Sequence, residues 1–458
     1  MNRKILLAAL LLCLGIHTLH AAEKPNVIII LTDDQGYSDI GVFGAVGFKT
    51  PNLDSLAKDG GQYTSFYVAS NVCSPSRAAL MTGCYPHRTG VTNVLFPQRG
   101  ENAGPGLDGL HPDEITMAEI LKQAGYATMC VGKWHLGDAQ PFLPTRQGFD
   151  DYFGLPYSND MSQKLQKAYP PLPLMSGEET IETEPDQRFL TKRYTEKAVE
   201  FITANREKPF FLYLAHTMPH IPIFASPEFE GSSEHGLYGD VIQEIDWSVG
   251  EILKTLETLG LTENTLIVFT SDNGPWLNQG DHGGHCVPLS HGKSTVYDGG
   301  HRVPCIMRWP GVIQPGTVSD EIITSMDLFP TVARAAGVSV PDDRVIDGMD
   351  ITDFLAGRES SPRTTYFYML TAVRHGDWKL FTPGNYQEYT PKDEQGRQRI
   401  ISTKYDHFRL YNLRDDISET TDLHAERPEI VEELKTLLED FRKDIRANAR
   451  PLGDVRKL

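Results

Sequence analysis

A cysteine, an arginine and the start of a helix lie close together in the segment Asn71–Gly83, N-V-C-S-P-S-R-A-A-L-M-T-G. Pro75 suits the first turn of a helix and Gly83 suits its end, so Cys73 is predicted just before a helix. Arg77 is then on the first turns, where it can reach back toward the cysteine. The free N–H groups and positive field at a helix N-terminus favour chemistry on anions. The alternative is a buried structural cysteine.

Two pairs of oxygen-bearing side chains stand where a metal ion could be held. Asp33 and Asp34 follow the apolar run Asn26–Thr32, and Asp272 and Asn273 follow a second such run. Adjacent carboxylates at the end of a buried strand repel each other unless a cation compensates them. Because all four are oxygen donors, they suit a hard cation, Ca²⁺ or Mg²⁺, better than zinc. A solvated turn is the alternative for each pair taken alone.

Basic and imidazole side chains follow two further apolar runs. Lys133 and His135 come after one of them, and His216 and His220 come after the other. Imidazoles suit proton transfer near neutral pH, and an ammonium group suits the binding of an anion. The alternatives are structural imidazoles and a solvated lysine.

The four apolar runs are predicted to be buried strands of one α/β sheet, because they are continuous, short and separated by helical segments. Ligands in open α/β sheets bind at the carboxyl ends of the strands. The polar side chains that end each run are therefore expected to share one edge of the sheet. The runs are Asn26–Thr32, Tyr126–Val131, Pro209–Leu214 and Thr265–Thr270.

Other segments are expected to surround these strands. Residues 138–187 are rich in Pro, Gly and polar residues and are predicted to be irregular and functional. The glycine-rich stretch 281–302 holds several histidines that would fit a zinc site, although the oxygen donors at the strand ends favour a hard cation. Helices are predicted at 50–59, 113–124, 189–204 and 238–259, and strands at 62–69 and 305–309.

The pattern changes near residue 362, where short strands replace the long apolar runs. Strands at Arg363–Tyr368, Thr371–Phe381 and Phe408–Asn412 precede a charged amphipathic helix at Pro428–Ala447. Strands followed by a single helix predict a small α+β domain. The chain is therefore expected to divide into a catalytic domain, 23–362, and a C-terminal domain, 363–458.

The length and the net charge of the chain argue against some classes of function. A chain of 458 residues can bury a large core, and 61 acidic against 43 basic residues give a net charge of −18, which argues against a nucleic-acid partner.

Arg3 and Lys4 precede the apolar run 5–16, and small residues follow at 21 and 22. This pattern predicts a signal peptide, residues 1–22, and hence an exported protein, periplasmic or secreted, with no stable membrane anchor. The six cysteines are too few for a disulfide scaffold.

C-S-P-S-R followed by L-M-T-G resembles the signature of the type I sulfatases, C-x-P-S-R-x-x-x-L/M-T-G. The resemblance extends from about residue 25 to about residue 425 and points to the branch of arylsulfatase A and N-acetylgalactosamine-6-sulfatase. His216 precedes the matched P-H-I-P segment and is a secondary candidate. The other matching segments are D-D-Q-G, G-K-W-H-L-G, S-D-N-G, G-K-S-T-V-Y-D-G-G-H-R-V-P and L-Y-N-L-R-D-D.

The resemblance implies an alkaline-phosphatase-like fold, with a large mixed sheet between helices and a smaller C-terminal domain of antiparallel sheet plus helix. It implies that a sulfatase-maturing enzyme oxidises Cys73 to formylglycine (3-oxoalanine), and that each subunit binds one Ca²⁺ rather than Mg²⁺. The implied metal ligands are Asp33, Asp34, position 73, Asp272 and Asn273. The implied catalytic residues are Cys73, Arg77, Lys133, His135, His220 and Lys293, and the implied substrate contacts are Lys133, His220, Lys293 and Arg302.

The implied reaction is hydrolysis of a sulfate ester. The aldehyde is hydrated to a geminal diol, one hydroxyl attacks sulfur, and the sugar oxygen leaves. Arg77 and the cation favour the deprotonated hydroxyl, while Lys133 and Lys293 hold the sulfate oxygens. His220 is the candidate acid for the leaving oxygen. His135 is the candidate base for the second hydroxyl, whose deprotonation expels sulfate and restores the aldehyde.

Two other functions fit parts of the sequence. A phosphatase or phosphodiesterase of the same superfamily would use a Ser or Thr nucleophile and two metals held by more Asp and His. A catalytically inactive, secreted glycan-binding protein would lack parts of the constellation, which is complete here. The expected substrate is a sulfated carbohydrate, such as a glycosaminoglycan or an algal polysaccharide, or an aryl sulfate in an assay.

Overall fold

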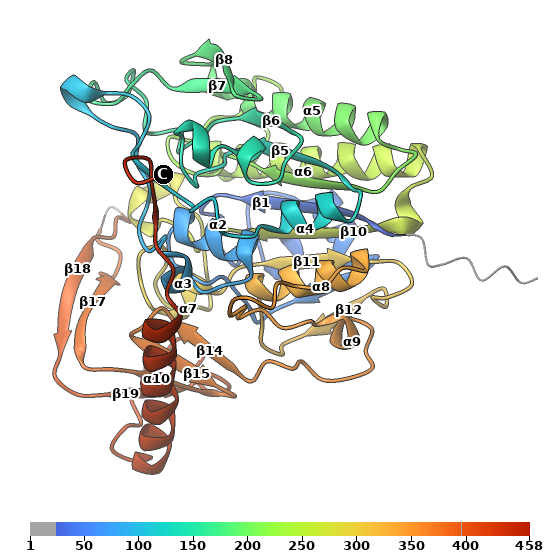
Figure 1. Ribbon diagram of the computed structural model, residues 1–458. Helices are drawn as coiled ribbons and strands as arrows, with labels where there is room; N and C mark the ends of the chain where they lie inside the picture. Colours follow the sequence, from blue (N-terminus) through green and yellow to red (C-terminus); the bar gives the residue numbers. More distant parts are fainter. Residues whose placement is uncertain (1–23, 395) are drawn as a thin grey trace, which may run out of the picture.

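The computed structural model describes residues 24–394 and 396–458 (Figure 1). Its centre is a mixed sheet of ten strands in the order β12-β2-β11-β10-β1-β9-β5-β6-β7-β8. The four middle strands are parallel neighbours, which confirms the prediction that the four apolar runs pair in one sheet. They are β10 (Thr265–Ser271), β1 (Asn26–Thr32), β9 (Phe210–Ala215) and β5 (Ala127–Gly132).

Helices cover both faces of this sheet, so all residues of the four middle strands are buried. Val27, Ile29 and Leu31 of β1 pack into the layer of α2, α4 and α8, whereas Ile28 and Ile30 pack into the layer of α1, α5 and α6. Each fully buried side chain of this size contributes about 1.5–3 kcal/mol to folding. The helices are α1 (Pro51–Lys58), α2 (Cys73–Thr82), α4 (Met117–Gln123), α5 (Leu190–Ala204), α6 (Gly236–Thr258) and α8 (Leu328–Ala336).

The backbone ladder continues past the strand ends and fixes the first residues of the loops. Lys133 N–H donates to the Ala215 carbonyl at 2.8 Å, and Asp272 N–H donates to the Thr32 carbonyl at 3.0 Å. β1 runs from right to left in Figure 1, so the carboxyl ends of the parallel strands meet on the left-hand side. The polar residues after each strand therefore start from one edge, as predicted.

The segment 138–187 is less irregular than predicted, because it adds three strands to the sheet. β6 (Asp151–Gly154) pairs parallel to β5, and β7 (Pro173–Ser176) and β8 (Glu179–Thr183) follow as an antiparallel hairpin. All five residues of β8 are exposed. Short strands at the edge of a sheet need not alternate apolar and polar residues. Their sequence therefore lacks the alternating pattern from which a strand is predicted.

Three local predictions were wrong in their boundaries, and one of them is the expected strand Thr371–Phe381, which is a hairpin of two strands, β15 (Ala372–His375) and β16 (Trp378–Phe381). The expected strand 62–69 is two strands, β2 (Gly61–Tyr63) in the main sheet and β3 (Phe66–Tyr67) paired with β13 (Ile323–Thr324). The expected helix 113–124 begins only at Met117, because Thr116 forms a capping box with Glu119. In that box the side chains of Thr116 and Glu119 each accept a hydrogen bond from the other residue's backbone N–H. These N–H groups would lack the side-chain partners if the helix began earlier in the chain.

A second, antiparallel sheet of four strands follows, in the order β14-β15-β16-β19, and α10 (Pro428–Asn448) packs on it. The hairpin of β17 (Gly384–Tyr389) and β18 (Ile400–Tyr405) was not predicted. The division at residues 362 and 363 stays a prediction, and the second sheet begins at Thr365. Its strands are β14 (Thr365–Tyr368), β15 (Ala372–His375), β16 (Trp378–Phe381) and β19 (Arg409–Asn412).

The C-terminal segment returns to the large sheet domain, where β20 (Gly453–Asp454) pairs with β4 (Asp108–Gly109).

No helix in the described part of the chain is long and apolar enough to cross a membrane. The predicted signal peptide, residues 1–22, lies outside the described residues. The remaining elements are β11 (Cys305–Arg308), β12 (Thr317–Ser319), α3 (Pro86–Thr89), α7 (Asp298–His301) and α9 (Thr352–Leu355).

Candidate active site

Cys73 is the first residue of α2, slightly further into the helix than predicted, and its side chain is buried. Gly83 ends the helix with a positive φ of 68°, as the sequence predicted. Burial raises the pKa of the Cys73 thiol to about 11, although Lys133 and Lys293 act in the opposite direction. The thiol therefore stays protonated at neutral pH and is a poor nucleophile in that form.

Arg77 lies one helical turn after Cys73, and its guanidinium group is fully buried. Its Nε and Nη2 donate to Asp272 Oδ2 at 2.9 and 2.8 Å, and Nη2 lies 3.3 Å from Asp33 Oδ2. Its Nη1 donates to the Lys133 carbonyl oxygen at 2.7 Å. Arg77 thus ties the start of α2 to the ends of β1, β5 and β10, rather than only reaching back toward the cysteine.

The second buried ion pair joins Lys133 to Asp33, and the Nζ of Lys133 also donates to Ser158 Oγ at 3.2 Å. Gly132 precedes the lysine with a φ of 102°, and a Cβ there would come within 1.9 Å of the Ala215 carbonyl oxygen. Only glycine accepts this combination of left-handed backbone and close approach. The turn after β5 therefore depends on glycine to direct Lys133 to the strand edge.

Asp34 is the meeting point of three other predicted residues. Its Oδ2 accepts from Lys293 Nζ at 2.7 Å and lies 3.7 Å from His220 Nε2, and its Oδ1 accepts from Asn273 Nδ2 at 2.7 Å. Asp34 and His135 both have positive φ angles, 65° and 62°. Backbone conformations of this kind are costly for non-glycine residues and cluster at functional sites.

The three carboxylates and three cations of the cluster are all buried, and their charges balance each other. Burial alone would raise the pKa of Asp33, but Lys133, His220 and Arg77 together hold it well below its usual value. Burial and the neighbouring Asp33 raise the pKa of Asp272 to about 7. When two carboxylates lie close together in a buried site, the pKa of one of them rises above that of the other, unless additional positive charge stabilises both ionised groups.

Two buried oxygens of the cluster are left without a hydrogen-bond donor in the described part of the chain, Asp33 Oδ1 and Asn273 Oδ1. The Asn273 amide donates its N–H₂ to Asp34 and to the Gly274 carbonyl, so its oxygen is the free end. Ligand atoms of Asp33, Cys73 and Asp272 also lie within 4.8 Å of one another. Unpaired buried oxygens among carboxylates fit a hard cation such as Ca²⁺.

His135 is buried, and its Nε2 lies 3.0 Å from the Leu95 carbonyl oxygen. Because a carbonyl only accepts, Nε2 carries the proton and Nδ1 is a free acceptor, which has no partner among the described residues. Burial, Lys133 and Arg77 hold the pKa of His135 well below its usual value. The ring is therefore neutral, with a free lone pair on Nδ1.

His220 has the opposite arrangement, because its Nδ1–H donates to the Ile221 carbonyl at 2.7 Å and Nε2 faces Asp34. It can release a proton from Nε2 only as an imidazolium. His216 lies outside the cluster, with Nε2 3.3 Å from Ser248 Oγ, and burial lowers its pKa to about 4. These contacts give His216 a structural role.

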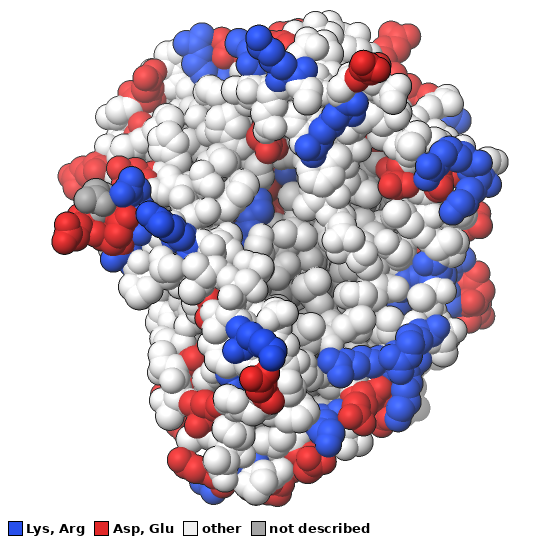
Figure 2. Space-filling view, turned by 90° about the vertical axis from the view of Figure 1, so that its left-hand side faces the viewer, with Lys and Arg blue, Asp and Glu red and all other residues white. Residues whose placement is uncertain are grey.

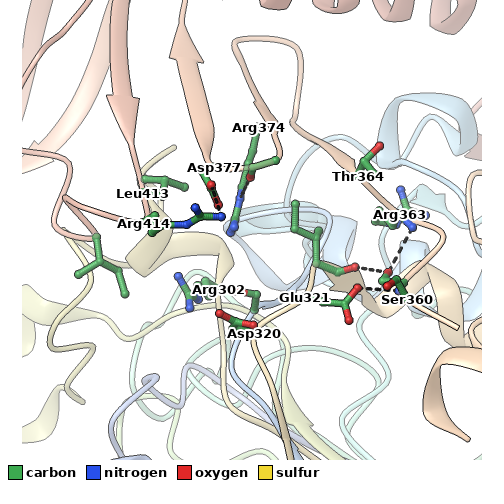
Figure 3. Close-up of a pocket in the computed structure, with 15 residues that line it drawn as sticks. Arg302, Asp320, Glu321, Ser360, Arg363, Thr364, Arg374, Asp377, Leu413 and Arg414 are labelled. Atoms are coloured by element: carbon green, nitrogen blue, oxygen red, sulfur yellow. Dashed lines mark hydrogen bonds and ion pairs between the residues drawn. The ribbon is translucent and has the colours of Figure 1, made fainter. Parts of the chain in front are cut away.

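The structure does not bring Arg302 to the cluster. Its Nε donates to the Thr64 carbonyl at 2.5 Å, and Nη1 lies 3.6 Å from Asp298. The prediction that Arg302 binds substrate gains no support from these contacts. Figure 3 shows Arg302 in a different pocket, at the junction of the two sheets, where Asp320, Glu321, Arg374, Asp377 and Arg414 also lie.

The histidines of 281–302 are separated by their own partners, and among the described residues they form no three-ligand group. His285 pairs with Asp39 at 3.0 Å, and His291 accepts from the Tyr389 N–H at 2.8 Å. His301 lies 2.8 Å from the Tyr366 hydroxyl. Among the described residues, the stretch 281–302 therefore offers no zinc site. The candidate metal site remains the set of oxygen donors at the strand ends, which suits a hard cation.

Sequence reasoning missed two residues of the site. Ser158, which contacts Lys133, lies after β6, the fifth parallel strand of the same edge. The polar S-N-D after the apolar D-Y-F-G was the signal that could have revealed it. Trp276 places its ring 4.3 Å from Lys293 Nζ and 5.7 Å from the His220 ring, which no sequence pattern indicated.

Figure 2 shows the face that carries the carboxyl edge of the sheet. A hollow near its centre shows basic atoms among mostly uncharged side chains, with a few acidic atoms beside them. Most acidic side chains lie toward the outline of this face. This distribution provides the local cations that an acidic chain needs to attract an anion.

Known proteins resemble the chain over most of its length. A family model described as Sulfatase matches residues 25–338, and a model described as N-sulphoglucosamine sulphohydrolase, C-terminal matches residues 289–444. The N-acetylgalactosamine-6-sulfatase of Mus musculus is 40% identical over 403 residues, 84% of this chain and 77% of that protein. Arylsulfatase A of Homo sapiens is 37% identical over 455 residues, 92% of this chain and 88% of that protein.

A solved structure, Ps i-CgsB in complex with k-i-k-neocarrahexaose, has a similar fold. It superposes with a TM-score of 0.77 at 29% identity and covers 95% of this chain and 96% of that chain. The similarity therefore includes both sheets.

Proposed function

The chain belongs to the sulfatase family, and from this membership we propose that it removes sulfate from a sulfated carbohydrate. The family assignment and the alkaline-phosphatase-like fold agree with the sequence predictions. One relative is named for a sulfated amino sugar, and one similar structure holds a carrageenan-type oligosaccharide. Both support a carbohydrate substrate, and an aryl sulfate would serve in an assay. The N-terminal sequence pattern supports export.

The observation that carries the proposal is the dry cluster around Cys73, in which three carboxylates face three cations. Each carboxylate accepts from at least one of Arg77, Lys133 and Lys293. Such a concentration of fixed positive charge in a water-poor site stabilises charge that develops on a sulfate group.

The nucleophile is proposed to be formylglycine made from Cys73, since the protonated thiol of the unmodified residue is unreactive. The hydrated aldehyde supplies a hydroxyl that can attack sulfur. Because the side chain is only 2% exposed, a sulfatase-maturing enzyme would have to act before the chain closes around it. Arg77 would favour the ionised hydroxyl by its charge.

A Ca²⁺ ion is proposed to be held by Asp33, Asp34, Asp272, Asn273 and the modified residue at position 73. The fit rests on the two unpaired buried oxygens and on the all-oxygen donor set. The bound ion would act as a Lewis acid toward a sulfate oxygen. It would also compensate the carboxylates, which would leave the ammonium groups of the two lysines available to the substrate.

Calcium is expected to stabilise the protein measurably. At a free concentration of about 100 times Kd, one bound ion adds about 2.7 kcal/mol to the free energy of unfolding. The Tm measured in Ca²⁺ should exceed the Tm in EGTA by a few degrees, and Asp272→Ala should remove the difference. Asp343→Ala, which changes an exposed carboxylate paired with Arg344, should retain it. Equal Tm values for the unmutated protein in Ca²⁺ and EGTA would exclude the calcium site.

Lys133 and Lys293 would bind the sulfate oxygens, and the imidazoles would move protons. His135 presents an unprotonated Nδ1 and is the candidate base. His220 presents Nε2 toward Asp34 and is the candidate acid for the leaving oxygen. Burial and the neighbouring Lys293 lower the pKa of His220, while Asp34 acts in the opposite direction and favours the imidazolium form that this role requires.

Both imidazoles are expected to be needed for turnover. Replacing His135 or His220 with alanine should lower kcat by ~10²–10⁴-fold, as is typical of general acid–base groups. With an aryl sulfate of low leaving-group pKa, His220→Ala should lose much less, because that oxygen needs little protonation. His216→Ala is the matched control and should keep kcat. Unchanged kcat in either variant would remove that residue from the mechanism.

The proposed function is tested by the mass of the tryptic peptide that carries position 73, from protein made together with a maturing enzyme. Replacement of H₂S by one oxygen atom, together with sulfate release from a panel of sulfated oligosaccharides, is the expected result. An intact thiol in protein that nevertheless releases sulfate would overturn the formylglycine mechanism. No sulfate release from fully modified, calcium-loaded protein would overturn the substrate class.

A further inference from the structure

A second group of metal-ligating side chains lies far along the chain from the candidate active site. His407 is in the turn between β18 and β19, and Asp422 and His424 are in the loop between β19 and α10. One ligand atom from each lies within 4.8 Å of the others. We propose that His407, Asp422 and His424 form a binding site for a transition-metal ion of the Zn²⁺ type.

The distances match the edges of a tetrahedral site. Four ligands at roughly 2.0–2.1 Å from a zinc ion lie about 3.4 Å from one another. Asp422 Oδ2 is 3.0 Å from His424 Nδ1 and 3.5 Å from His407 Nε2. The two rings lie 4.7 Å apart between centroids. Only small side-chain rotations would be needed to admit the ion.

The backbone holds the carboxylate in place for this role. Asp422 Oδ1 accepts from the Leu410 N–H and from the His424 N–H, each at 3.0 Å. These bonds anchor one oxygen and leave Oδ2 directed at the two imidazoles. Hydrogen bonds that fix a ligand in advance raise metal affinity, because less freedom is lost on binding.

The donor set selects the kind of metal. Two imidazoles with one carboxylate favour Zn²⁺ and other late first-row ions, whereas Ca²⁺ prefers an all-oxygen set. The His407 side chain is 52% exposed and the His424 side chain 36%, so an ion can reach the site from solvent. Water would complete the coordination. The donor chemistry therefore separates this site from the calcium site proposed above.

The loop that carries Asp422 and His424 also supports the candidate active site. In that loop, buried Glu419 accepts from the Asp298 N–H at 2.7 Å and pairs with Lys379 at 2.7 Å. Ser418 Oγ donates to the Pro288 carbonyl at 2.7 Å. A metal ion would fasten this loop to the β18–β19 turn and so brace the segment 288–298, which contains Lys293. The metal ion would therefore have a structural role, because it would link the loop 413–427 to the turn between β18 and β19.

The test is titration of ZnCl₂ into a Cys73→Ala variant of the full chain, saturated with Ca²⁺, followed by calorimetry. This background removes the Cys73 thiol from the active-site cluster and occupies the carboxylates of that cluster. One equivalent of Zn²⁺ should bind with a micromolar Kd, and His407→Ala and His424→Ala should each raise Kd at least ~10-fold. Visible absorption of bound Co²⁺ should show tetrahedral coordination, and Zn²⁺ should raise the Tm only when both histidines are present.

His111→Ala is the matched control, because His111 pairs with a single carboxylate, Asp113, at 3.6 Å. Its zinc affinity should equal that of the Cys73→Ala parent. Absence of saturable binding below ~1 mM, or a Kd unchanged in both the His407 and the His424 variants, would overturn the proposal. The readouts do not involve turnover, so they stand whether or not the proposed sulfatase mechanism holds.

Discussion

Replacing Cys73 with alanine is expected to abolish sulfate release, with kcat lowered by at least ~10⁴-fold. The reason is chemical, since alanine cannot be oxidised to an aldehyde and the site then has no hydroxyl to attack sulfur. The fold should survive, because the thiol makes no hydrogen bond that the structure records and alanine fits the first turn of α2. Turnover of an aryl sulfate and of sulfated oligosaccharides, with Tm measured in parallel, checks this.

Cys305→Ala provides the matched control for that variant. Cys305 is an equally buried free thiol, but it lies on β11 and has no contact with the cluster in the described structure. Its loss should leave kcat unchanged. Residual turnover of Cys73→Ala above ~1% of the unmutated level would place the nucleophile at a residue other than position 73.

The second large effect is expected on stability, from Arg77→Met. Methionine fills a similar volume but leaves Asp272 buried opposite Asp33 without the guanidinium group. Removing one partner of a buried ion pair costs about 3–5 kcal/mol of unfolding free energy. Denaturant unfolding in EGTA should show this loss. In Ca²⁺ the loss should be smaller, because the bound ion compensates the same carboxylates.

Arg334→Met serves as the control for a surface ion pair. Arg334 pairs with Asp350 and Asp353 on the outside of α8 and is about half exposed. Exposed pairs are screened by water and salt, so this variant should lose much less stability. Equal losses for Arg77→Met and Arg334→Met would contradict the view that the cluster is an energetically coupled, dry site.

Local sequence patterns predicted the strands that build this edge of the sheet and the types of residue that follow them. The four apolar runs became neighbouring parallel strands because continuous β-branched and aromatic runs must be buried on both faces. Once they are parallel, their carboxyl ends coincide, which places Asp33, Lys133, His220 and Asp272 at one edge of the sheet. Local signals also sufficed for the Gly83 helix end, because helix termination depends on a few adjacent residues.

The contacts between these groups, and the separation of other candidates from them, depend on how distant segments pack. Arg302 and His216 carry the right chemistry, yet their positions direct them to Thr64 and Ser248. Ser158 and Trp276 entered the site through strand order and loop packing, which are non-local.

The surface trio of His407, Asp422 and His424 is another such result. Two of its members are separated by β19 from the third, and hydrogen bonds between Leu410 and the segment 422–423 help to bring them together. A sequence pattern specifies an element through its neighbours along the chain. Contacts between side chains of distant segments depend instead on how the elements pack, and that is set by burial over the whole molecule.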